Sequence, residues 1–236
     1  AGLSRGLGDV YKRQVLGCKA PFNFSHVMDG KKTLKEIIVE APHGVKLVPG
    51  ASGIQNLAAL NKIQTAAIIS AFSEIESEID FLIVDMAAGL SDSVMTFLCA
   101  CQKRYIVVKN EPSSIADAYA TIKVMLQDFN LNNISLIPNG VISQTDGMRL
   151  SKNINTVIKN FLGGNVDYLH SITFDEMILR STKASKCLLD YAPSSNATRD
   201  FKELAKIITS QDSASAISGG LQFFVERMTM NQARVG

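Results

Sequence analysis

The stretch FLIVDMAAGLSDSV, residues 81–94, decides the fold class. Four apolar residues lead to an acid, Asp85, which is followed by small residues and by the expected start of a helix near Ser91. A short, continuous apolar run of this kind is typical of a strand in a parallel sheet, buried on both faces. Ligands bind beyond the carboxyl ends of such strands. Asp85 is therefore a candidate to hold a magnesium ion over a nucleotide.

An acid at this place has an alternative interpretation. It can cap the following helix or accept hydrogen bonds from turn amides. The next residues favour a binding site, because Ala87, Ala88 and Gly89 let the backbone approach a phosphate and leave its amides available to an anion.

Four other segments have the same continuous apolar character as residues 81–85 and are predicted strands: 45–49, 104–109, 134–141 and 166–172. Apolar residues recur at helical spacing between residues 115 and 129 and between residues 197 and 208. Alternating strands and helices predict an α/β fold, with a mostly parallel sheet flanked by helices. We expect the strands to be buried on both faces.

Composition excludes several classes of protein. A chain of 236 residues, 46% of them hydrophobic, can form one sizeable core. Because 24 basic and 22 acidic residues nearly balance, we expect no nucleic-acid partner. The sequence has neither an apolar run of about 20 residues nor a signal peptide, which predicts a cytoplasmic protein.

The cysteines and histidines predict no metal site. The four cysteines form no C-x-x-C pair, and the three histidines lie far from them and from each other in the sequence. The cysteines are expected to be free thiols.

A Gly-Lys pair within MDGKKTL, residues 28–34, does not form a phosphate loop. Ser25 and Lys32 stand where the motif G-x-x-x-x-G-K-[ST] requires Gly and Ser or Thr. The segment instead predicts a turn followed by a helix that Thr33 caps, with Glu36 completing a reciprocal capping box.

From about residue 15 to residue 228 the chain resembles the MinD/ParA group of ATPases, and within it the flagellar-number regulators of the FlhG and FleN branch. The resemblance rests on NFSHVMDGKKTLKEIIVEAPHGVKLVPGASGIQNLAAL (23–60), IVDMAAGLSDSVMTF (83–97), NEPSSIADAYATIKV (110–124) and GGLQFFVERM (219–228). The last two stretches narrow it to the flagellar branch.

The resemblance implies a regulator of flagellar number and placement that binds and hydrolyses ATP with magnesium. It implies a switch between a monomer and an ATP-bound homodimer, reversibly attached to the inner face of the cell membrane, with flagellar assembly proteins as partners. Two alternatives stay open. One is a non-enzymatic interaction module, and the other is a chromosome-partitioning ParA-like ATPase, which the near-neutral charge disfavours.

The resemblance also assigns roles to four residues. Asp85 falls on the acid that orders magnesium and its waters in catalysis, and Gly89 falls in the switch that senses the terminal phosphate. Asn139 matches an asparagine that hydrogen-bonds the adenine edge, although an Asn in a strand-to-loop turn is an equal alternative. Asp175 matches an acid beside the base, but SITF at 171–174 departs from the usual Gly-x-Ile-Pro-Tyr type of segment.

The family's phosphate loop, similar to GKGGVGK[ST], has no match in residues 1–14, AGLSRGLGDVYKRQ. We interpret this segment as foreign to the family, and residues 15–209 as an incomplete MinD-like ATPase domain. The family's first strand lies beside the strand that ends at Asp85. Its absence predicts a central strand without a hydrogen-bonding partner, and a chain that is inactive as an ATPase.

The C-terminal segment predicts a separate function. A linker at 210–220 precedes an amphipathic helix at 221–230, whose apolar stripe has the spacing i, i+3, i+4 and i+7 and consists of Leu221, Phe224, Val225 and Met228. Such a helix can lie on a membrane, which makes these four residues candidate membrane contacts. Alternatively it docks on its own domain or on a partner protein.

Overall fold

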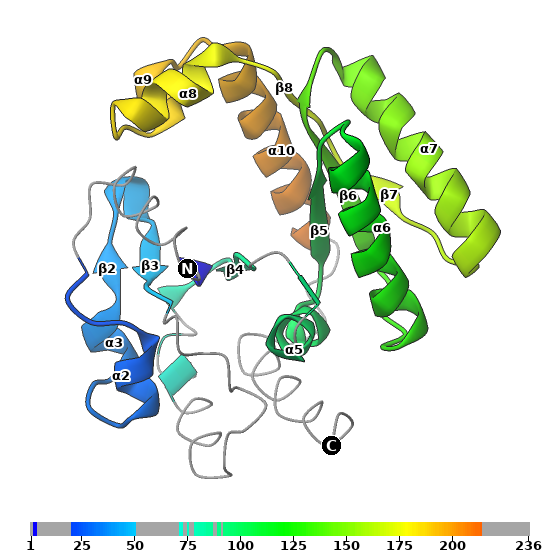
Figure 1. The fold of residues 1–236 in the computed structure, drawn as a ribbon. Helices are drawn as coiled ribbons and strands as arrows, with labels where there is room; N and C mark the ends of the chain where they lie inside the picture. The colour runs from blue at the N-terminus through cyan, green and yellow to red at the C-terminus, as the bar shows by residue number, and fades with distance from the viewer. Residues whose placement is uncertain are drawn as a thin grey trace. The chain divides into compact units, whose positions relative to one another are not determined.

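The computed structural model describes residues 2–3, 20–50, 71–72, 75, 78–86, 89–90 and 92–213. The chain divides into two compact units, of which unit 1 comprises Ala1–Cys101 with Gly219–Gly236 and unit 2 comprises Gln102–Ser218. Each unit contains its own sheet and its own helices (Figure 1). The predicted boundaries of the foreign segment, the ATPase domain and the linker stay predictions.

Unit 1 is built on a small, mainly parallel sheet. Its described elements are β1 (Gly2–Leu3), α2 (Phe24–Met28), α3 (Leu34–Ile37), β2 (Val39–Glu40), the 3-10 turn η1 (Pro42–Gly44), β3 (Lys46–Val48), β4 (Ile83–Val84) and α5 (Asp92–Ala100). The strand order is β2-β3-β1-β4, and only β2 is antiparallel to its neighbour.

Strand β1 corrects the expectation that the strand ending at Asp85 lacks a partner. Gly2 pairs with Leu47 and Ile83, and Leu3 pairs with Val48 and Val84, both in parallel register. The pairing uses only backbone N–H and C=O groups, which any extended segment can supply. Residues 2–3 therefore occupy the place between β3 and β4.

Among the described residues, the core of unit 1 covers one side of the segment around β4. Buried side chains from α2, α3, β3 and α5, together with Phe72 and Ile75, form this core: Phe24, Val27, Leu34, Ile37, Val48, Phe97 and Ala100. Leu82, Val84 and Met86 pack against it at alternate positions. Phe81 and Ile83 lie on the other side and are 40% and 70% exposed. The prediction that this strand is buried on both faces is therefore wrong.

The predicted helix cap after the Gly-Lys pair is confirmed. The Glu36 amide donates to Thr33 Oγ1 at 3.3 Å, and the Thr33 amide donates to Glu36 Oε2 at 2.8 Å. Gly30 adopts a left-handed φ of 67° in the preceding turn. The segment is therefore a turn and a capped helix in the structure, as the sequence indicated.

Unit 2 contains a parallel sheet centred on a long strand. Its described elements are β5 (Arg104–Val108), α6 (Pro112–Gln127), β6 (Ile134–Val141), α7 (Gln144–Leu162), β7 (Asp167–Tyr168), β8 (Ile172–Thr173), α8 (Glu176–Lys183), α9 (Leu188–Tyr191) and α10 (Asn196–Ser213). Strand β5 lies along one edge of β6, and β7 and β8 pair with successive parts of the other edge.

Helices cover both faces of β6 (Figure 1). Leu136, Ile137 and Pro138 are consecutive and all buried. Ile137 belongs to a cluster shared with α8, α9 and α10, whereas α6 and α7 contribute buried side chains such as Ile122 and Ile158. The prediction of burial on both faces is confirmed for β6, but β5 departs from it, since Val107 is 59% exposed.

Candidate functional site

Asp85 lies directly after β4, at the carboxyl end of a parallel strand. It follows the alternation of that segment, so its exposed side chain is on the same side as Ile83 and opposite the core. An exposed carboxylate fits the way proteins bind magnesium, through one or two carboxylates together with retained waters and phosphate oxygens. The donor chemistry at Asp85 therefore suits the ion that the family implies.

Four residues after Asp85, the backbone conformation requires a glycine at position 89. Its φ is +116°, which side-chain-bearing residues rarely adopt, and among the described residues beyond its two chain neighbours no atom lies within 4 Å of where a Cβ would stand. Conformation rather than crowding therefore selects glycine here. Ala87 and Ala88, also expected at this site, lie outside the described residues.

Asn139 lies near the carboxyl end of β6, where it pairs with Ile172 of β8. The register shifts between Asn139 and Val141, and the intervening Gly140 has a φ of +70°. Asn139 is half-buried, and its side chain makes no hydrogen bond with any other residue in the described part of the chain. Asn139 is thus placed at the carboxyl ends of the strands, where ligands of parallel sheets bind.

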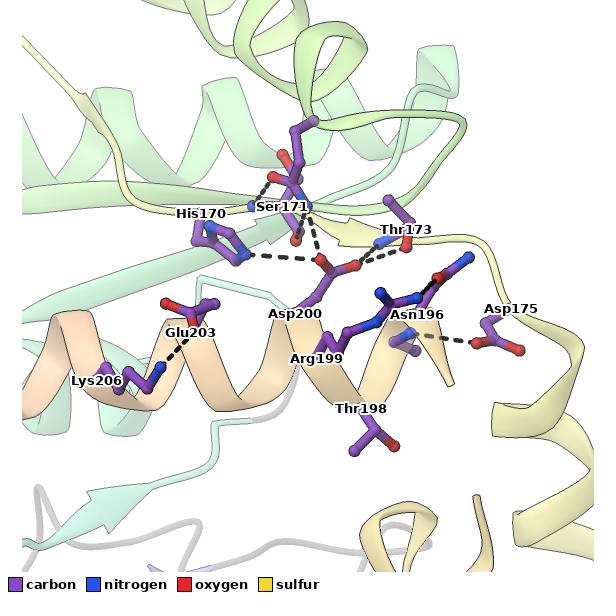
Figure 2. Close-up of polar contacts among 12 residues, drawn as sticks. His170, Ser171, Thr173, Asp175, Asn196, Thr198, Arg199, Asp200, Glu203 and Lys206 are labelled. Atoms are coloured by element: carbon purple, nitrogen blue, oxygen red, sulfur yellow. Dashed lines mark hydrogen bonds and ion pairs between the residues drawn. The ribbon is translucent and has the colours of Figure 1, made fainter. Parts of the chain in front are cut away.

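Asp175 has a structural role at the start of α8. Its Oδ1 accepts a hydrogen bond from the Met177 amide at 2.9 Å. Its Oδ2 accepts one from the Ala197 amide at 3.2 Å, which Figure 2 draws as the dashed line that ends on Asp175. The Met177 amide, joined by the Ala197 amide and the Ser195 hydroxyl, holds the pKa of Asp175 below its usual value, although burial opposes this shift. Asp175 therefore caps α8 and attaches it to the start of α10.

The predicted site residues fall into two pairs. Asp85 and Gly89 belong to unit 1, and Asn139 and Asp175 belong to unit 2. Within unit 2, β8 connects the second pair, since Ile172 pairs with Asn139 and Asp175 follows two residues after the strand ends.

Asp200, on α10, was missed by the sequence interpretation. Its carboxylate accepts hydrogen bonds from the Thr173 amide at 2.8 Å, from Thr173 Oγ1 at 2.6 Å and from Gln144 Nε2 at 2.9 Å. Its place on the apolar stripe of α10, three residues after the buried Ala197, was the available signal.

The described residues contain neither a cluster of metal ligands nor a membrane-spanning helix. No three His, Cys, Asp or Glu side chains there cluster in a way that could hold a metal ion. No helix in these ranges is long and apolar enough to cross a membrane. The predicted membrane contacts Leu221, Phe224, Val225 and Met228 lie outside them.

Comparison with known proteins identifies the family. No family model matches the chain. MinD from Pyrococcus horikoshii, solved as a complex with Mg-ADP, aligns with a TM-score of 0.63 and 20% identity over 92% of this chain and 86% of that one. Antiactivator FleN of Pseudomonas aeruginosa is 34% identical over 231 residues, which cover 98% of this chain and 82% of FleN. The chain belongs to the FleN/FlhG family of MinD/ParA-type flagellar-number regulators.

A second relative supports the same family. This FleN/FlhG-type chain is 29% identical over 221 residues to the Flagellum site-determining protein YlxH of Helicobacter pylori, covering 91% of this chain and 74% of YlxH. The family predicted from the sequence is thereby confirmed, and so is the α/β fold class.

Proposed function

We propose that this flagellar-number regulator, when it carries the family's phosphate loop, is an ATP-driven switch that binds ATP with magnesium and hydrolyses it. The observation that carries the proposal is the pair Asp85 and Gly89, with an exposed carboxylate at the end of β4 and a glycine of left-handed φ four residues later. The complex of a fold relative, MinD, with Mg-ADP supports the choice of ligand.

Each predicted residue has a task in this switch. Asp85 would hold a magnesium ion, which would neutralise negative charge on the phosphates. Gly89 lets the backbone approach the terminal phosphate without a side chain in the way. Asn139 offers its amide to the adenine edge, and Asp175 holds the neighbouring segment in place.

Residues 1–14 do not match the GKGGVGK[ST]-like loop, so we propose that this chain by itself hydrolyses ATP only at a background rate. The test compares it with a chimera in which the phosphate-loop segment of a relative replaces residues 1–14. The chimera should show magnesium-dependent hydrolysis. Turnover by the unmodified chain at the chimera's rate would refute the proposal for this chain.

The role of Asp85 is tested in the same chimera. Asp85→Asn should lower the magnesium-dependent rate by about 100-fold or more, because it removes a charge that acts on the phosphates. Asp80→Asn is the matched control: it makes the same change at an exposed site before β4 and should leave the rate unaltered. A folded chimera without turnover would favour the non-enzymatic interaction module.

We further propose that ATP drives homodimerisation and reversible attachment of this cytoplasmic protein to the inner face of the membrane. The apolar stripe of Leu221, Phe224, Val225 and Met228 supports attachment, since two such helices in a dimer add their affinities. Phe224→Glu should abolish sedimentation with anionic liposomes, and unchanged sedimentation would favour docking on protein instead. The name antiactivator, given to FleN, suggests that flagellar partners include an activator protein.

A further inference from the structure

The Asp200 carboxylate joins three parts of unit 2. Its Oδ2 accepts both hydrogen bonds from Thr173, and its Oδ1 accepts the bond from Gln144 (Figure 2). His170 Nε2 lies 3.8 Å from the same Oδ1. Asp200 is only 14% exposed, so these bonds are shielded from water. One side chain of α10 therefore contacts the start of α7 and the end of β8.

Gln144 holds Ser171, the residue that precedes Ile172 in the chain. Its Nε2 donates to the Ser171 carbonyl at 2.9 Å, and its Oε1 accepts from the Ser171 amide at 3.3 Å and from the Tyr168 hydroxyl at 2.9 Å. The backbone is thus held at Ser171 by Gln144 and at Thr173 by Asp200, and the Gln144–Asp200 bond links the two attachments.

The segment held in this way borders the candidate site. Ile172 pairs with Asn139, Thr173 pairs with Val141, and the Phe174 amide donates to the Val141 carbonyl at 2.8 Å. The first turns of α10 therefore hold this segment twice, through Asp200 and through the bond from the Ala197 amide to Asp175.

We propose that Asp200 is a positioning residue, which sets the course of residues 171–175 along β6 and thereby the part of the site that carries Asn139 and Asp175. Only the identity of the ligand at this place rests on the proposed function. The placement of the segment rests on the contacts within unit 2.

The chemistry of the contacts explains why the residue is an aspartate. The Thr173 amide, the Thr173 hydroxyl and the Gln144 amide are three donors that converge on one side chain, and an ionised carboxylate is an acceptor only. An asparagine would turn an NH₂ group toward at least one of these donors. Asp200→Asn therefore keeps the shape of the side chain but leaves at least one of the three donors without an acceptor.

The first experiment measures amide hydrogen exchange of the whole chain. Asp200→Asn should speed exchange within residues 171–175 by about tenfold or more, while the centres of α7 and α10 stay protected. Glu203→Gln is the matched control, because Glu203 lies on the same helix and pairs there with Lys206 at 2.5 Å. It should leave residues 171–175 unchanged.

Two results would overturn the proposal. Unaltered exchange at residues 171–175 would show that Asp200 does not position them, and a uniform rise across unit 2 would show a role in general stability alone. If Asp200→Asn fails to fold, Thr173→Val replaces it, because it removes only the hydroxyl donor at 2.6 Å. That variant must then give a smaller loss of protection confined to the same residues.

The second experiment addresses the ligand. In the chimera that carries the phosphate loop, we expect Asp200→Asn to weaken ATP binding by about tenfold while inorganic tripolyphosphate, which has no base, binds as before. Equal losses for both ligands, or no loss for ATP, would overturn a role at the base end. If the chimera without this substitution binds no ATP, the proposed function fails, and the hydrogen-exchange result alone decides the role of Asp200.

Discussion

Strands β4 and β6 are both apolar in sequence, yet they are buried to different degrees. In β6, Leu136 and Ile137 point to opposite faces and both are buried, because helices cover each face of the unit 2 sheet. Near β4, Val84 packs into the core of unit 1 while Ile83 is 70% exposed. Apolar composition thus predicts the strand, but neighbouring elements determine how many of its faces are covered.

The difference extends to the residues that follow the strands. Near β6, the segment that carries Asp175 is held by side-chain hydrogen bonds from α7 and α10. Near β4, the best-defined requirement is the left-handed backbone of Gly89. Unit 2 therefore positions its part of the candidate site by packing and polar contacts, whereas Gly89 contributes through its main chain.

The largest expected effect is on the free energy of unfolding, and it differs between substitutions in β6 and in β4. Leu136→Ala should lower the free energy of unfolding by about 2 to 5 kcal/mol, because it leaves a cavity in a covered sheet. Ile83→Ala should cost less than about 1 kcal/mol, because most of this side chain is already in contact with solvent. Urea denaturation followed by circular dichroism measures both, and similar losses would mean that β4 is covered on both faces in solution.

A smaller loss of stability is expected at two glycines, Gly147, where a side chain would be crowded, and Gly89, where the backbone conformation disfavours one. In Gly147→Ala the new Cβ would stand 1.8 Å from Ser171 Oγ, so this substitution should destabilise by about 1 to 3 kcal/mol, although Gly→Ala within a helix normally stabilises. Adding Ser171→Gly should recover part of the loss. Gly89→Ala should cost a similar amount, about 1 to 3 kcal/mol, through its φ alone.

Thermal melting of the single and double variants measures these changes. No substitution of a residue packed nearby should rescue Gly89→Ala, because among the described residues beyond its two chain neighbours no atom lies within 4 Å of the added Cβ. Such a rescue would contradict a purely conformational requirement at Gly89. If Ser171→Gly does not relieve Gly147→Ala, crowding is not the cause at Gly147.

The smallest effect concerns the two carboxylates that cap helices. Hydrogen bonds from Lys32 and from Thr33 lower the pKa of Glu36 from 4.5 to about 2, and backbone amides lower the pKa of Asp175. In both cases the pKa in the folded state lies below that in the unfolded state. Each ionised carboxylate therefore stabilises the folded state, and this contribution is complete above the unfolded-state pKa. It is lost as pH falls through the folded pKa, which for Glu36 means between about 4.5 and 2.

Salt should separate these two titrations. Glu36 is 47% exposed and paired with Lys32, so 1 M NaCl should raise its pKa, whereas the pKa of Asp175 should change little, because fixed amides lower it. Carboxyl chemical shifts in an NMR titration report both groups. Lys32→Gln should raise the pKa of Glu36 at low salt, and an unchanged value would contradict the assigned cause.

Local features were predictable because their signals lie close together in the sequence. The Thr33 and Glu36 capping box involves residues three positions apart, and the strands near residues 46, 104 and 134 appear as continuous apolar runs. The role of Asp200 was not predictable in the same way. Its position on the apolar stripe of α10 was visible, but its partner Thr173 is 27 residues away and Gln144 is 56 residues away.

The amino-acid sequence by itself determined the α/β class, through its periodicity. It also determined the family and the candidate residues Asp85, Gly89 and Asn139, through stretches that resemble a known family. Only the tertiary structure decided which face of β4 is covered, that Gly2–Leu3 pairs beside it, and that α10 holds the segment before Asp175. The reason is physical. Burial and hydrogen bonding between distant segments depend on how the chain folds back on itself, which no local pattern of residues records.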